Sequence, residues 1–186
     1  MPKRLYRLLL AGLGLFFPIA PLSRAAQLPP QPSLPLPHSA RLVWVARATG
    51  VQIYKAQGPA GSPGALRWVF QEPEATLEDP AGNKIGRHFR GPCWEAADGS
   101  RIEGAGPPLA QVPGRTAADV PWLVVPVKST GPAGVLSAVT RALRIDTLGG
   151  AAPATPPTRA GEIARVPYRA IYLFLAPEPG SSPAPH

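Results

Sequence analysis

The chain has 186 residues and a single cysteine, Cys93, which excludes an internal disulfide and any cysteine-based metal site. Its formal net charge is +8, and Lys3, Arg4, Arg7 and Arg24 carry four of the positive charges. The other Lys and Arg residues are spread singly, without interleaved aromatic residues. Because a nucleic-acid-binding surface needs clustered basic residues, we expect no nucleic-acid partner.

The first 25 residues have the three parts of a secretory signal peptide. A basic stretch, MPKRLYR, is followed by the apolar run LLLAGLGLFFPIAPL, and Ser23 and Ala25 suit the small-residue positions before a cut at Ala26. The apolar run is shorter than the roughly 20 residues that a membrane-spanning helix needs, and it contains two prolines. We therefore expect residues 1–25 to be removed. The mature protein would have no transmembrane segment and would be exported, either to the periplasm or as a secreted protein.

Proline-rich segments flank the remaining sequence. Residues 26–40 read AQLPPQPSLPLPHSA, and proline fixes φ and lacks an N–H, so this segment predicts an extended linker. The end of the chain, residues 177–186, is similar and predicts a disordered tail. Residues 41–176 remain as one β domain of ordinary size.

Within this domain the apolar residues mostly follow the alternation of β-strands. The predicted strands are, in chain order, 41–48, 51–57, 65–71, 75–79, 83–89, 94–98, 101–104, 120–129 and 168–176. Thr49-Gly50 predicts a tight turn between the first two, while residues 135–147 predict a short helix or turn leading into a strand. The sequence therefore predicts a mainly β fold. We expect a single antiparallel β-sandwich or barrel-like domain with at most one short helix.

The most chemically diverse stretch is GRHFRGPCWEAADGSRIEG, residues 86–104. Strand alternation places Trp94 and Asp98 on one face and Glu95 on the other. Asp98 is expected to cap the turn towards Ser100, and Trp94 is expected to be a core aromatic residue. His88 is the only histidine in the body of the domain, and with Glu95 or Asp98 it would form a general acid/base pair.

Metal and cofactor motifs are missing from the sequence. Glu74, Glu78 and Asp79 surround a turn, but their spacing is not that of a calcium loop. The chain also has no Gly-x-Ser-x-Gly nucleophile elbow and no glycine-rich phosphate loop followed by Lys-Ser or Lys-Thr. We expect neither a metal nor a cofactor.

Two classes of function remain open. The favoured hypothesis is a non-catalytic envelope module, structural or glycan-binding, whose partner is a cell-envelope glycan or protein. Its candidate ligand-binding residues are Trp94, Glu95, His88 and Trp122, and it predicts an exposed tryptophan beside polar groups. The alternative is a small hydrolase-like enzyme that uses His88 with Glu95 or Asp98, and it predicts that these groups meet in a pocket. We favour the first hypothesis because no nucleophile motif is present.

Several motifs also carry a family resemblance. They are VQIYKA at 51–56, GPCWEAADGS at 91–100, PWL at 121–123 and TLGGAAP at 147–153. In this order they resemble the domain of unknown function 3455 family (DUF3455), which is found in exported bacterial and fungal proteins. The resemblance covers about residues 40–175 and implies an exported domain, but it brings no agreed activity, substrate or catalytic residue.

The sequence departs from the family pattern at two cysteines. The pattern often has one just after the VQIY motif and another shortly after GGxAP, where this chain has Ala56 and roughly Pro156-Pro157. The resemblance therefore implies that this chain lacks a disulfide that relatives carry. Cys93 lies at a variable position of the pattern and is expected to be a buried thiol.

Overall fold

The computed structural model describes residues 33–35, 39–58 and 66–179. The predicted signal peptide, residues 1–25, lies outside the described residues, as do most of the predicted linker and of the predicted tail. Every regular element of the described part is a β-strand, so the prediction of a mainly β fold is confirmed. No helix capable of crossing a membrane occurs among these residues.

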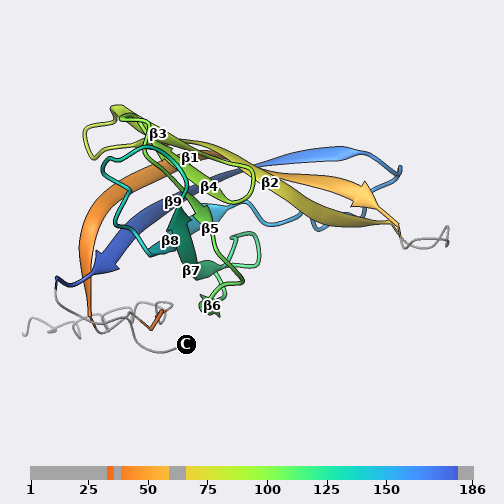
Figure 1. The fold of residues 1–186 in the computed structure, drawn as a ribbon. Helices are drawn as coiled ribbons and strands as arrows, with labels where there is room; N and C mark the ends of the chain where they lie inside the picture. The colour runs from red at the N-terminus through yellow and green to blue at the C-terminus, as the bar shows by residue number, and fades with distance from the viewer. Residues whose placement is uncertain (1–32, 36–38, 59–65, 180–186) are drawn as a thin grey trace, which may run out of the picture. The chain divides into compact units, whose positions relative to one another are not determined.

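The strands form one antiparallel sheet (Figure 1). They are β1 (Ala40–Gln57), β2 (Arg67–Glu78), β3 (Lys84–Phe89), β4 (Cys93–Ala96), β5 (Arg101–Gly104), β6 (Ala110–Val112), β7 (Trp122–Ser129), β8 (Arg141–Gly149) and β9 (Ile163–Pro177). Their order in the sheet is β5-β4-β3-β2-β1-β9-β8-β7-β6. Because β5 also pairs with β7, the sheet curves round and closes on itself. Of the two predicted alternatives, this is the barrel-like one.

The predicted turn at Thr49-Gly50 is wrong, because β1 runs straight through it. Gly50 pairs with Ala75 of β2 on one side and with Tyr168 of β9 on the other. A Cβ atom at Gly50 would collide with the carbonyl oxygen of Glu74. The glycine is therefore explained by the close approach of the neighbouring strand, and pairing on both edges overrides the local turn signal.

Other boundaries also shift once the strands are paired. The predicted strands 65–71 and 75–79 are one continuous strand, β2, and the strand predicted at 168–176 begins earlier, at Ile163. The ambiguous segment 135–147 is a turn that leads into β8, as one of its two alternatives predicted. The short strand β6 was not predicted.

The core inside the closed part of the sheet is aromatic. Trp94 of β4 packs against Tyr172 and Phe174 of β9, with ring centroids 5.6 Å and 6.1 Å away. Trp44 of β1 also packs against Phe174, with ring centroids 5.1 Å apart. Leu77 of β2 is buried in the same cluster. These inward positions are the alternate residues of each strand, as the period of two requires.

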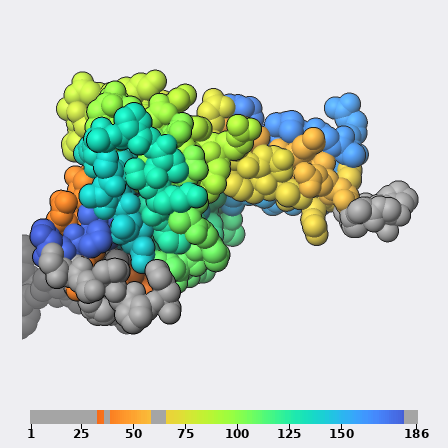
Figure 2. Space-filling model, viewed as in Figure 1, coloured from red at the N-terminus to blue at the C-terminus, as the bar shows by residue number. Residues whose placement is uncertain are grey.

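Beyond the closed part, β1, β2 and β9 continue as a three-stranded ribbon, which is the narrower part of the unit in Figure 2. In this ribbon the backbone of Ala56 forms hydrogen bonds with Gly161 and Glu162. Trp68, which is paired with Ala56, donates its indole N–H to the carbonyl oxygen of Thr155 at 2.9 Å. The two places where the resemblance implies paired cysteines therefore lie at the same end of the sheet.

Candidate functional site

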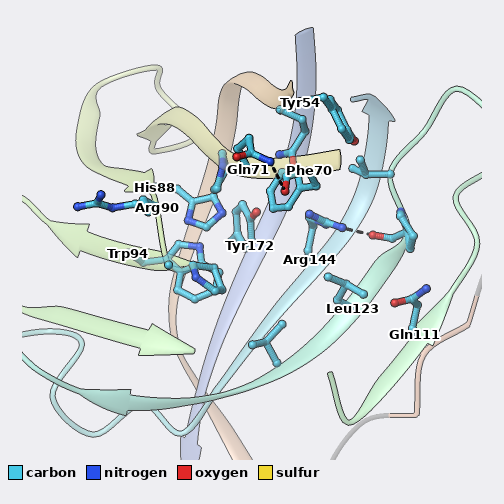
Figure 3. A pocket seen from close by; sticks show the side chains of 17 residues that line it. Tyr54, Phe70, Gln71, His88, Arg90, Trp94, Gln111, Leu123, Arg144 and Tyr172 are labelled. Carbon is cyan, nitrogen blue, oxygen red and sulfur yellow. Dashed lines mark hydrogen bonds between the residues drawn. The ribbon is translucent and has the colours of Figure 1, made fainter. Parts of the chain in front are cut away.

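A cavity of about 540 Å³ opens into the closed part of the sheet (Figure 3). Its lining comes from seven of the eight strands that close the sheet, all but β5, and from short β6. The side chains with polar or aromatic chemistry are Gln52, Tyr54, Phe70, Gln71, His88, Arg90, Trp94, Gln111, Arg144 and Tyr172. Among the described residues that line the cavity, none is Asp, Glu, Lys, Ser, Thr or Cys. The wall is therefore aromatic and cationic.

The aromatic wall of the cavity is formed by His88 and Trp94, which are cross-strand neighbours, and by Tyr172. His88 and Trp94 are directly opposite each other in the β3–β4 hairpin, whose turn contains Gly91 at φ 122°. Their rings stack at 4.5 Å and 7°. The ring of Tyr172 meets the edge of this pair, 5.1 Å from His88. Only 2% of His88 and 2% of Trp94 is exposed, so packing holds both rings in place.

His88 is neutral at physiological pH. Its Nδ1 lies 2.8 Å from the carbonyl oxygen of Cys93, which can only accept, so Nδ1 carries the proton and Nε2 is unprotonated. Burial lowers the pKa of His88 to about 3, the hydrogen bond to Cys93 opposes this shift, and the charge of Arg144 adds to it. A base this weak contributes little to proton transfer near pH 7.

The predicted pairing of His88 with a carboxylate is wrong. Glu95 points to the opposite face of β4, where it forms a salt bridge of 2.9 Å with its cross-strand neighbour Arg87. Asp98 accepts hydrogen bonds from the backbone and hydroxyl of Ser100, at 2.9 Å and 2.6 Å, and from the backbone N–H of Val135 at 2.7 Å. Neither carboxylate lines the cavity. Strand alternation separates Glu95 from the site, and turn capping occupies Asp98.

The prediction of an exposed tryptophan beside polar groups is also wrong. All four tryptophans lie among the described residues, and each is buried or half-buried. Trp122 lies on β7 with the guanidinium of Arg115 5.7 Å from its ring, and it does not line the cavity. Of the candidate residues, the structure thus brings together His88 and Trp94 and leaves Glu95, Asp98 and Trp122 outside. Trp94 faces inward because it forms part of the core with Tyr172 and Phe174.

Arg144 was missed as a site residue by sequence reasoning. It is half-buried on β8, and its Nε donates to the carbonyl oxygen of Pro121 at 3.0 Å. Within the described part of the chain, no carboxylate lies within salt-bridge distance of its guanidinium. The sequence signal that could have identified Arg144 is its position as a charged residue inside the alternating strand pattern ALRIDT.

Three buried donors of the cavity wall have no hydrogen-bond partner among the described residues. They are the carboxamide NH₂ of Gln52, the indole N–H of Trp94 and the hydroxyl of Tyr172. Burial raises the pKa of Tyr172 and the charge of Arg144 opposes the shift, so the hydroxyl stays protonated. The hydroxyl of Tyr168, the guanidinium of Arg144 and the indole of Trp94 are its neighbours, but none of them reaches hydrogen-bond geometry with it. The hydroxyl of Tyr168 is also close to Gln52 and is likewise unpartnered. Unpartnered buried donors are rare and costly, so this grouping indicates a place for an acceptor.

The described residues hold no group of three His, Cys, Asp or Glu side chains that could bind a metal ion. Cys93 is 3% exposed, and the expectation of a buried thiol is confirmed. Burial raises the pKa of its thiol, and the charge of Glu103 adds to the shift. Cys93 is therefore a structural residue of β4 and not a reactive one.

The comparisons with known proteins give one match. A family model described as "Protein of unknown function (DUF3455)" matches residues 37–176. Neither the curated proteins nor the solved structures give any match to the chain.

Proposed function

Because the chain belongs to DUF3455, a family of unknown function, its activity has to be argued from its site, and we propose that it is a non-catalytic module that binds a small organic molecule inside the closed sheet. The signal-peptide pattern of residues 1–25 supports the further proposal that the protein is exported and works in the periplasm or outside the cell. An envelope component is then the expected source of the ligand.

One observation carries the proposal of binding. A cavity of about 540 Å³ is lined by three residues, Gln52, Trp94 and Tyr172, whose buried donors lack hydrogen-bond partners among the described residues. Cavities of roughly 300–1,000 Å³ with few polar groups in an apolar wall are typical of small-molecule sites. A ligand that accepts hydrogen bonds from these donors would offset the free energy lost when they were buried.

The hydrolase-like alternative has weaker support. His88 has a pKa of about 3 and stacks flat on Trp94. The described lining supplies no carboxylate to orient it and no serine, threonine or cysteine nucleophile. The same residues that make the wall unsuitable for general acid/base chemistry make it suitable for holding an aromatic or apolar group.

The test uses two naphthyl probes that fluoresce in apolar surroundings, N-phenyl-1-naphthylamine and 8-anilinonaphthalene-1-sulfonate. We expect saturable binding of at least one probe to the purified protein. Leu123→Trp fills the cavity and should abolish binding, whereas Leu148→Trp makes the same change at an exposed residue outside the cavity and should not. Circular dichroism confirms that both variants fold.

A second blocking variant distinguishes loss of access to the cavity from a packing defect that Leu123→Trp could cause. Gln111 is exposed at the rim of the cavity, so Gln111→Trp blocks access without disturbing the core. Failure of both probes to bind the protein, or equal binding to the protein and to both blocking variants, would overturn the proposed function.

A further inference from the structure

Resting on the proposed function, we propose that the ligand is an organic acid: its anionic group pairs with Arg144, and its aromatic or apolar body lies against the wall formed by His88, Trp94 and Tyr172. The charge of the cavity, its unpartnered donors and the character of its wall each support this class of ligand.

The first support is the charge of the cavity. Its lining contains two guanidinium groups, half-buried Arg144 and exposed Arg90, and no carboxylate among the described residues. Arg144 uses its Nε for the carbonyl oxygen of Pro121, which leaves its net charge without a counter-ion in the described structure. A half-buried charge is costly until an opposite charge approaches, so an anion is favoured and a cation is disfavoured.

The charge of Arg144 acts on the whole wall. It opposes the rise in pKa that burial causes in Tyr54 and in Tyr172, and it adds to the lowering of the pKa of His88. These three side chains come from β1, β9 and β3, so the field of one guanidinium reaches three sides of the cavity. Together with a lining that contains two guanidinium groups and no carboxylate among the described residues, this favours negative charge in the cavity.

The second support is the kind of hydrogen bond that the wall can form. The unpartnered donor atoms of Gln52, Trp94 and Tyr172 are buried within the cavity wall, and each carries a hydrogen that no described residue accepts. An indole N–H can only donate, so Trp94 requires an acceptor. A carboxylate accepts only, at about four lone-pair positions, and its bonds from N–H and O–H donors are stronger than those of a neutral acceptor. The donor set thus favours a ligand with accepting atoms over one that can only donate, such as an ammonium group.

The third support is the wall opposite Arg144. Figure 3 shows the His88–Trp94 pair on the β3–β4 side and Arg144 on the β7–β8 side of the cavity. Because His88 is neutral, the stacked pair is an uncharged aromatic surface. A ligand that meets both sides needs an acidic group at one end and an aromatic or apolar body at the other.

The experiment compares two probes that differ by one acidic group. 8-Anilinonaphthalene-1-sulfonate carries a sulfonate, and N-phenyl-1-naphthylamine is the same ring system without it. We expect Arg144→Gln to weaken binding of the sulfonate probe about tenfold or more, as loss of a charged hydrogen-bond partner does, and to change binding of the neutral probe less than twofold. Arg144→Lys also loses the donor to Pro121 but keeps the charge, and it should retain most of the sulfonate affinity.

Arg169→Gln is the matched control, because it removes the same charge from an exposed residue of β9 outside the cavity. It should leave both probes unaffected. If Arg144→Gln leaves the ratio of the two affinities unchanged while Leu123→Trp abolishes binding, the organic-acid inference is wrong and the binding module stands. Sulfonate binding that persists in both Leu123→Trp and Gln111→Trp would place the probe outside the cavity and would also overturn the inference.

Discussion

Ser100→Ala tests whether the polar stretch at residues 98–100 is structural. Ser100 is 0% exposed, and its hydroxyl connects two segments. It donates to the carboxylate of Asp98 at 2.6 Å and accepts the backbone N–H of Leu136 at 3.1 Å. Alanine removes that acceptor, and the N–H of Leu136, itself a fully buried residue, is left without a partner.

The expected cost follows from that orphaned N–H. A buried donor without a partner destabilises a protein by about 1–3 kcal/mol, and the exposed carboxylate of Asp98 turns to water without adding to this figure. Urea unfolding followed by tryptophan fluorescence measures the change in the free energy of unfolding. Ser137→Ala is the control, because Ser137 is exposed and its hydroxyl accepts only the N–H of Gly134 in its own turn, so we expect a cost below about 0.5 kcal/mol.

Two results would refute this reasoning. Equal stabilities of the two alanine variants would show that the hydroxyl of Ser100 does not hold the two segments together. A Ser100→Ala variant of unchanged stability that no longer bound the naphthyl probes would instead give this turn a part in the site, although it does not line the cavity.

Three further predictions concern burial and charge. Burial raises the pKa of Asp119, but hydrogen bonds from Gly149 and Thr116 outweigh burial and hold the pKa below its ordinary value of 3.8. The ionised carboxylate therefore contributes its full share to the free energy of unfolding above pH 3.8, and this share is lost as the pH falls further. Asp119→Asn should therefore lose less stability than the unchanged protein between pH 5 and pH 2 in urea titrations, and parallel curves would contradict this. Trp94→Ala should cost about 3–5 kcal/mol in the same assay because the ring is buried in the core, and a loss below about 1 kcal/mol would show a loosely packed wall. Cys93 should resist thiol reagents in the folded protein and react once in urea, and rapid labelling without urea would contradict its burial.

Local periodicity determined much of what the sequence predicted correctly. Alternation with a period of two identified the mainly β fold and placed Trp94 inward and Glu95 outward on the same strand. The Asp-Gly-Ser turn likewise depends on neighbours within three residues, so the capping position of Asp98 could be predicted. Each of these features involves interactions over a few residues of chain.

Strand pairing decided the rest. Gly50 resembles a turn residue in sequence, but partners on both edges keep it in β1. Gln52, Arg144 and Tyr172 lie on three different strands, and only the pairing of β1 with β9, of β9 with β8 and of β5 with β7 brings them around one cavity. The alternation of residues along a strand predicts which side chains point inward, but it does not predict which strands are neighbours. Register and closure are set by contacts between residues far apart in the chain. The sequence by itself therefore determined the class of fold and the direction of single side chains, and the tertiary structure alone decided that an unpaired arginine and three unpartnered donors share a site.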